Sequence, residues 1–140
     1  DNRVIAAYQQ LGFKLVVDPS VNYSGYFDAR SRSITMKQID DSVYHELGHF
    51  LAFIAGNADK TASFQSIFAA EKANVTAFNK AYVTQNASEY FAESVKDYIL
   101  NNASLKSSRP QTYAAVQNAL NQITDAQIAK IQKIYGAFWN

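Results

Sequence analysis

Both histidines of this 140-residue chain lie in one five-residue segment, His45-Glu46-Leu47-Gly48-His49. Residues that are four positions apart lie on the same face of an α-helix, with roughly 5–6 Å between their Cβ atoms. Two imidazole rings at that spacing can hold one metal ion, and the intervening Glu46 projects beside the metal, where it can act on a metal-bound water molecule. The motif therefore requires a helix here and a further ligand from elsewhere in the chain. It predicts a zinc-dependent hydrolase, in the first place a peptidase.

The residues around the motif are apolar, which places the predicted helix in the protein interior. The apolar positions are Val43, Tyr44, Leu47, Phe50, Leu51 and Ile54. A helix over residues 41–56 fits this pattern, with Asp40 or Asp41 as its N-terminal cap and Gly56 as its end. The alternative is a chance match on a surface helix. However, two imidazoles and a glutamate buried without a metal would lack partners, at a cost of about 1–3 kcal/mol each.

The third ligand of a catalytic zinc ion must come from a carboxylate in this chain. Such a site needs three protein ligands and one open position, and the sequence has no cysteine and no further histidine. Glu89 and Glu93 are the best candidates, because they lie four positions apart on a helix predicted over residues 87–101. One of them would bind zinc, and the other would accept the remaining N–H of a ligand histidine. Without the histidine motif, the pair would be interpreted as part of a solvent-exposed helix face.

The remaining pattern predicts an α+β fold, in which a small N-terminal antiparallel sheet precedes a mainly helical, zincin-like half. A strand is predicted over residues 13–17 and a hairpin over 25–37. Further helices are predicted over 3–11, 61–72, 110–122 and 125–138, whereas 74–85 is ambiguous. Linkers, repeats and low-complexity tracts are missing, so residues 1–140 are expected to form a single domain.

Composition limits the partners of the protein. A net charge of +1 offers no concentrated positive surface for nucleic acid or a membrane, and the sequence has no apolar run of about 18 residues that would span a bilayer. The absence of cysteine is compatible with an oxidising exterior. The chain begins at Asp1, as it would after removal of a signal peptide or after trimming. We expect a monomeric protein that is secreted by a bacterium.

The two helices that carry these motifs resemble those of the gluzincin metallopeptidases. The resemblance is closest to the group that contains the catalytic domain of anthrax lethal factor and the clostridial Pro-Pro endopeptidases. The shared pattern is H-E-x-x-H at 45–49, E-[YF]-F-A-E at 89–93, and a tyrosine, Tyr82, seven positions before the first of those glutamates. The segment that starts at Arg109-Pro110-Gln111-Thr112-Tyr113 and reaches Leu120 is similar to the Pro-Gln-Thr-Tyr helix of the Pro-Pro endopeptidases. The resemblance covers most of residues 34–121.

This resemblance implies a role for each polar residue of the motifs. It implies three zinc ligands, which are His45, His49 and Glu89. It implies Glu46 as the general base and acid, Tyr82 as a hydroxyl donor to the developing oxyanion, and Glu93 as the partner of a ligand histidine. For Tyr82 the alternative is an ordinary half-buried aromatic residue, because the chain contains nine tyrosines.

The resemblance also implies that a protein or peptide substrate binds in extended form along an edge strand just before the metal helix, at residues 33–37. The active site is then expected in a cleft between this strand and the helices at 41–56 and 87–101. We make no prediction of cleavage between prolines, because the single tryptophan, Trp139, is far from this strand in sequence. Two other functions stay open. One is a non-catalytic zinc-binding or interaction domain on a peptidase scaffold, and the other is a zinc hydrolase that acts on a non-peptide amide.

Overall fold

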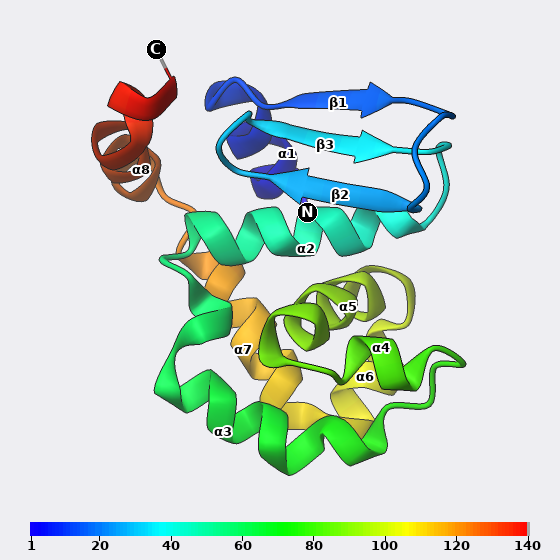
Figure 1. Ribbon diagram of the computed structural model, residues 1–140. Helices are drawn as coiled ribbons and strands as arrows, with labels where there is room; N and C mark the ends of the chain where they lie inside the picture. The colour runs from blue at the N-terminus through cyan, green and yellow to red at the C-terminus, as the bar shows by residue number, and fades with distance from the viewer. Residues whose placement is uncertain (140) are drawn as a thin grey trace.

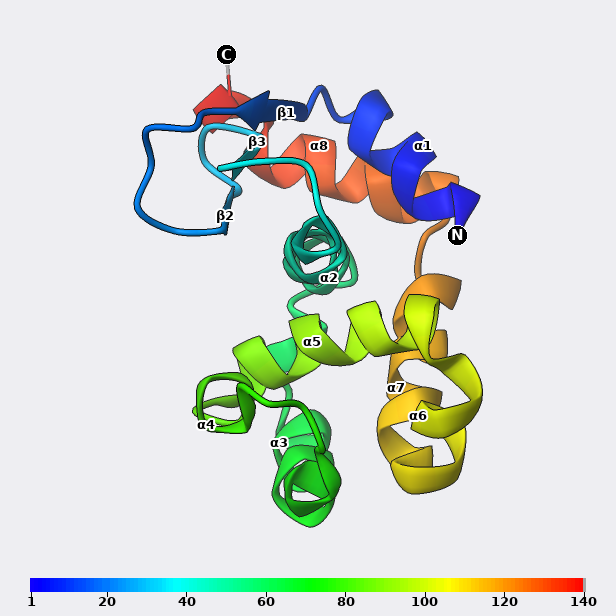
Figure 2. The same ribbon diagram turned by 90° about the vertical axis from the view of Figure 1, so that its right-hand side faces the viewer.

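Helix α2 (Ser42–Ile54) runs through the middle of the molecule, with a small sheet on one side and a group of helices on the other (Figure 1). This computed structural model describes residues 1–139. The first and last helices, α1 (Asn2–Gln10) and α8 (Asp125–Trp139), lie on the sheet side of α2 (Figure 2). The predicted α+β class is confirmed.

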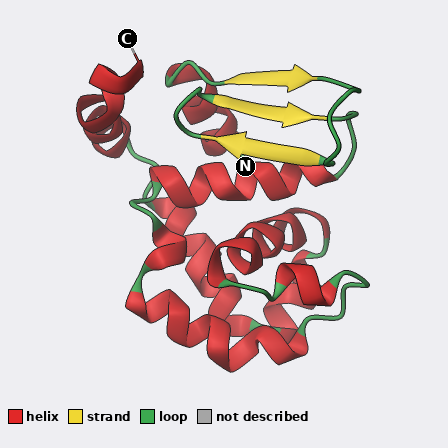
Figure 3. Ribbon diagram, in the orientation of Figure 1, coloured by secondary structure: helices red, strands yellow, loops and turns green. Residues whose placement is uncertain are grey.

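The other side of α2 is helical (Figure 3). Its elements are η1 (Ala58–Lys60), α3 (Ala62–Glu71), η2 (Lys72–Asn74), α4 (Lys80–Val83), α5 (Ala87–Leu100), α6 (Asn102–Ser108) and α7 (Pro110–Asn121). All six helices predicted from the sequence are present, and their ends agree within one or two residues. The ambiguous segment contains α4. Helix α6 was not predicted, because its asparagine and serines favour turns and it buries only Leu105. None of the helices in residues 1–139 is both long and apolar enough to cross a membrane.

The sheet is mixed, which corrects the predicted antiparallel arrangement. Its strands are β1 (Lys14–Val17), β2 (Gly25–Asp28) and β3 (Ser33–Met36), in the order β1-β3-β2. β2 and β3 form the predicted antiparallel hairpin, but β3 then inserts between β2 and β1 and runs parallel to β1. The connection 18–24 between β1 and β2 passes the end of β3, so that β3 lies between the two strands (Figure 1). The prediction that residues 33–37 form an edge strand is therefore wrong, because β3 is central.

The hydroxyl of Tyr8 on α1 is part of the ladder between β1 and β3. It donates to the carbonyl of Lys14 at 2.5 Å and accepts from the amide of Ile34 at 3.1 Å. Burial raises the pKa of Tyr8 to about 12, against the opposing effect of the Ile34 amide. The hydroxyl therefore stays protonated at neutral pH and can fill both roles.

The core continues from the sheet through α2 into the helical side. Ile34 and Met36 of β3 are fully buried in the same cluster as Phe50 and Leu51 of α2. On the opposite side α2 packs along α5, and Gly48 makes their close approach possible, because a Cβ atom there would lie 2.6 Å from the carbonyl oxygen of Ala92. The two helices that carry the sequence motifs are therefore direct neighbours.

The end of α8 closes on the turn between β2 and β3. The indole of Trp139 donates to the carbonyl of Ala29 at 3.0 Å, and the guanidinium of Arg32 lies over the indole at 5.2 Å. The indole also meets the ring of Phe13 edge-on, at 5.7 Å between centroids. The only tryptophan is thus close to the strands in space, although it is far from them in sequence.

Candidate metal centre

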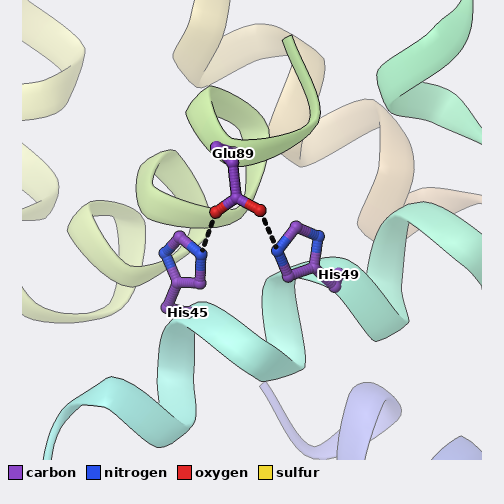
Figure 4. A group of neighbouring side chains, drawn as sticks. All are labelled: His45, His49 and Glu89. Atoms are coloured by element: carbon purple, nitrogen blue, oxygen red, sulfur yellow. Dashed lines mark hydrogen bonds and ion pairs between the residues drawn. The ribbon is translucent and has the colours of Figure 1, made fainter. Parts of the chain in front are cut away.

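His45, His49 and Glu89 meet between α2 and α5 (Figure 4). The Nε2 atom of His45 lies 2.9 Å from Oε2 of Glu89, and the Nε2 atom of His49 lies 3.2 Å from Oε1 of the same carboxylate. One ligand atom from each residue lies within 4.8 Å of the others. The structure thus brings together the three residues that the sequence indicates as metal ligands. Their role as ligands stays a prediction.

Glu93 lies one helical turn beyond Glu89 and holds the other side of His45. Its Oε1 atom is 3.0 Å from Nδ1 of His45. Burial alone would lower the pKa of His45, but the hydrogen bonds to Glu89 and Glu93 raise this pKa to about 9. Burial opposes ionisation of both carboxyl groups, but the same hydrogen bonds hold the pKa of each below its usual value. The carboxylates of Glu89 and Glu93 therefore favour a positive charge between them.

The local sequence fixes the direction of these side chains. On α2 the two histidines are one turn apart, and their rings lie 5.0 Å apart between centroids. Asn86 caps α5, since its side-chain oxygen accepts from the amide of Glu89 at 2.8 Å. This cap places Glu89 in the first turn of α5, where the helix dipole favours a negative charge.

Glu46 is buried beside the two histidines and faces the edge strand β2. Burial raises its pKa above the usual value, against the effect of the two nearby histidines. Gly25 of β2 leaves the space for this side chain, because a Cβ atom there would lie 2.9 Å from Cγ of Glu46. A carboxyl group with a raised pKa beside a candidate metal site is suited to accept and release a proton.

Tyr82 of α4 lines a cleft of about 280 Å³ together with Glu46 and the three candidate ligands. Its side chain is more than half exposed, so it differs from an ordinary half-buried aromatic residue. Burial and the charge of Glu89 raise the pKa of Tyr82 above its usual value. The hydroxyl is therefore protonated at neutral pH and available as a donor toward the cleft.

The sheet side of the cleft comes from β2, which the sequence analysis missed. Gly25, Tyr26 and Phe27 line it, and the ring of Phe27 lies nearly parallel to that of His49 at 6.4 Å. The segment Gly25-Tyr26-Phe27 was recognised as a strand, but a hairpin pattern does not show which of its strands lies at the edge. The one signal in the sequence for this wall of the cleft is a glycine followed by two aromatic residues.

The side chains fit a zinc ion in both chemistry and spacing. Imidazole nitrogens and a carboxylate oxygen are usual zinc donors, and ligand atoms around a tetrahedral zinc ion lie roughly 3.3 Å apart. Glu89 has one oxygen 2.9 Å from Nε2 of His45 and its other oxygen 3.2 Å from Nε2 of His49, and both distances are close to that spacing. The bond from His45 to Glu93 leaves Nε2 of His45 as the nitrogen directed to the site. This arrangement is the one that outer carboxylates impose on ligand histidines.

Comparison with known proteins places the chain in a family. Residues 21–119 match the family described as "Anthrax toxin lethal factor, N- and C-terminal domain", and the chain belongs to this family. This confirms the resemblance that the two helices indicated.

One relative is a Pro-Pro endopeptidase of Clostridioides difficile (strain 630), and the two sequences are 41% identical over 78 residues. The match covers 53% of the present chain and 34% of that protein, so the chain spans about a third of the length of this curated relative.

Proposed function

We propose that this domain is a zinc-dependent endopeptidase that hydrolyses peptide bonds of an extended polypeptide. The observation that carries the proposal is the convergence of His45, His49 and Glu89 next to a buried Glu46. The family, and an endopeptidase as a relative, support the same chemistry. The bacterial source of the relative supports a bacterial protein, and we propose that it is secreted.

In the proposed reaction, Glu46 moves the protons. His45, His49 and Glu89 would hold a zinc ion, which would act as a Lewis acid and lower the pKa of a bound water molecule toward about 7. Glu46 takes a proton from the attacking water molecule and later delivers it to the leaving amine. A general base of this kind contributes typically about 10²–10⁴ in rate. Its raised pKa, which results from burial, suits both steps.

Tyr82 stabilises the negative charge that develops on the carbonyl oxygen. Tyr82 lines the same cleft as the histidines, and its raised pKa keeps the hydroxyl protonated at neutral pH. Glu93 holds the ring of His45 through Nδ1, so that Nε2 is directed toward Glu89.

The substrate backbone pairs with β2 rather than with β3. The amide of Lys37 donates to the carbonyl of Ser24, which makes this pair a hydrogen-bonded one. Pair types alternate along an antiparallel ladder, so the backbone groups of Gly25 and Phe27 point away from β3. They face the edge of the sheet where β2 lines the cleft, next to the Glu46 side chain. An extended peptide can add there as a further strand.

A peptide-library cleavage assay tests the proposal. The protein is incubated with zinc and a proteome-derived peptide library, with a chelator control and the variant Glu46→Gln as a matched control of the same shape. We expect cleavage that needs zinc and that Glu46→Gln abolishes, while zinc content measured by metal analysis is unchanged. Activity retained by Glu46→Gln would rule out Glu46 as the base.

The same assay separates the two alternative functions. Zinc binding without cleavage of any peptide would support a non-catalytic zinc-binding or interaction domain. Hydrolysis of small amide substrates alone would support a hydrolase that acts on non-peptide amides.

A further inference from the structure

Strand β1 forms the second edge of the sheet, on the side away from α2 and the cleft (Figure 1). No strand among residues 1–139 pairs with its outer side. All four of its residues are exposed, and Leu15, Val16 and Val17 keep 49%, 42% and 50% of their surface accessible. An exposed apolar edge of this kind is a template for pairing with another strand.

The hydrogen bonds of β1 show which backbone groups point outward. The amides of Lys14 and Asp18 donate to carbonyls of Arg32 and Met36, so alternate residues 14, 16 and 18 face β3. The backbone groups of Leu15 and Val17 therefore face the open edge. Outside these two, the amide of Phe13 already donates to the carbonyl of Tyr8, and Pro19 has no N–H group.

From these groups we propose that β1 pairs antiparallel with β1 of a second copy of this chain, with Leu15 opposite Val17 of the partner subunit. Among the two-fold registers, only this one lets both outward amides, those of Leu15 and Val17, donate to carbonyls of the partner subunit. A register with Leu15 opposite itself would place Val17 against the occupied amide of Phe13. A register with Val17 opposite itself would place Leu15 against Pro19.

Charge complementarity supports the same register. The register that places residue 15 opposite residue 17 also places Lys14 opposite Asp18 of the partner subunit. The two-fold symmetry produces this pair twice. Asp18 keeps its charge in a fixed place, because its Oδ1 accepts from the amide and hydroxyl of Ser20. Opposite charges directly across a strand pair are stabilising.

The faces of the sheet also continue across the proposed pair. Leu15 and Val17 are in register with Ile34 and Met36, so they lie on the helix-covered face. Leu15 and the partner's Val17 would extend that apolar face, while Val16 would meet its symmetry mate on the polar face, between the two ion pairs. The contact is small, so we expect a weak dimer that depends on concentration. The proposal differs from the monomer that the sequence predicts.

Single-cysteine variants test the register, because the natural chain has no cysteine. Residue 16 faces its own copy in a non-hydrogen-bonded pair, where Cα atoms lie about 4.5 Å apart, within disulfide range. We expect Val16→Cys to form a disulfide-linked dimer under mild oxidation. The equally exposed Leu15→Cys and Val17→Cys should form far less, because each faces a different residue. Equal cross-linking of all three variants, or none, would overturn the proposal.

Sedimentation equilibrium of the unmodified chain tests the ion pairs. We expect the average mass to rise with concentration, and Lys14→Glu to raise the dimer dissociation constant about tenfold or more, since two attractions become repulsions. Lys60→Glu on η1 makes the same charge change far from β1 and should leave the constant within about twofold. A monomer at millimolar concentration, or equal effects of both variants, would overturn the proposal and leave β1 to another occupant. Neither outcome depends on zinc or peptide cleavage.

Discussion

At the scale of single residues, Glu89 and Glu93 show how position decides role. They lie one turn apart on α5, yet Glu89 contacts Nε2 of both histidines, whereas Glu93 contacts only Nδ1 of His45. Sequence spacing shows that both carboxylates share a helix face, but it cannot show which of them reaches the two Nε2 atoms.

This difference predicts the order of two variants. Glu89→Ala should weaken zinc binding far more than Glu93→Ala, because the first removes a ligand and the second only the partner of a ligand. Loss of such an outer partner typically costs about 10–100-fold in metal affinity. Competition against a chromophoric chelator measures both affinities. The reverse order would mean that the two roles are exchanged.

Tyr82 allows a second prediction at this scale. Tyr82→Phe removes one hydroxyl donor, and the loss of one oxyanion donor typically costs about 10²–10³ in kcat. We expect that loss in steady-state assays with a cleaved peptide, without a change in zinc content. Tyr23→Phe is the matched control, since Tyr23 is an exposed tyrosine that does not line the cleft. Equal losses in both variants would argue against Tyr82 as the donor.

At the scale of elements, the spacing between α2 and α5 sets the geometry of the centre. Gly48 lies against Ala92 of α5, which stands between Glu89 and Glu93 in sequence. Any side chain at Gly48 would push apart the two helices that supply the ligands. The glycine of the motif therefore sets the packing of the two helices, whereas the histidines are the candidate metal ligands.

Gly48→Ala should both destabilise the fold and weaken zinc binding. Its Cβ atom would lie 2.6 Å from a backbone oxygen that cannot move without α5, and overpacking of this kind costs typically about 1–3 kcal/mol. Denaturant unfolding and zinc titration measure the two effects. Gly136→Ala in α8 is the control, because its Cβ atom would meet only the end of the Gln132 side chain, at 3.0 Å. If Gly48→Ala changed neither the stability nor zinc binding, the two helices would have space for a side chain at this position.

The Tyr8 hydroxyl links α1 to the sheet and gives the fold an alkaline limit. The pKa of Tyr8 is about 12 in the folded protein and about 10 in an unfolded chain. The unfolded state therefore loses its proton first, and the stability that Tyr8 contributes is complete below about pH 10 and lost as the pH rises toward 12.

Tyr8→Phe should lower the free energy of unfolding by about 1–3 kcal/mol at pH 7, because Lys14 and Ile34 lose a buried partner. The same variant should flatten the fall in stability above pH 10, as followed by denaturant unfolding at several pH values. An unchanged alkaline profile would mean that other groups set this limit.

At the scale of the whole molecule, the sequence predicts what depends on local periodicity and misses what depends on long-range packing. The helices around His45 and Glu89 follow from apolar residues at helical spacing, and Tyr82 was found through its offset from Glu89. The position of β3 between β1 and β2 was not predictable, because a hairpin pattern does not fix which side a third strand joins. For the same reason the role of β2 as the wall of the cleft was missed.

The contact between Trp139 and the β2–β3 turn joins the last helical turn of the chain to the strand proposed to seat the substrate. The candidate ligands of the ion, in contrast, lie on α2 and α5. On the proposed function, what is cut and how it is cut are therefore anchored in different parts of the molecule. Substitutions in the hairpin and in α8 can then change which substrate is cleaved, while the catalytic residues stay the same.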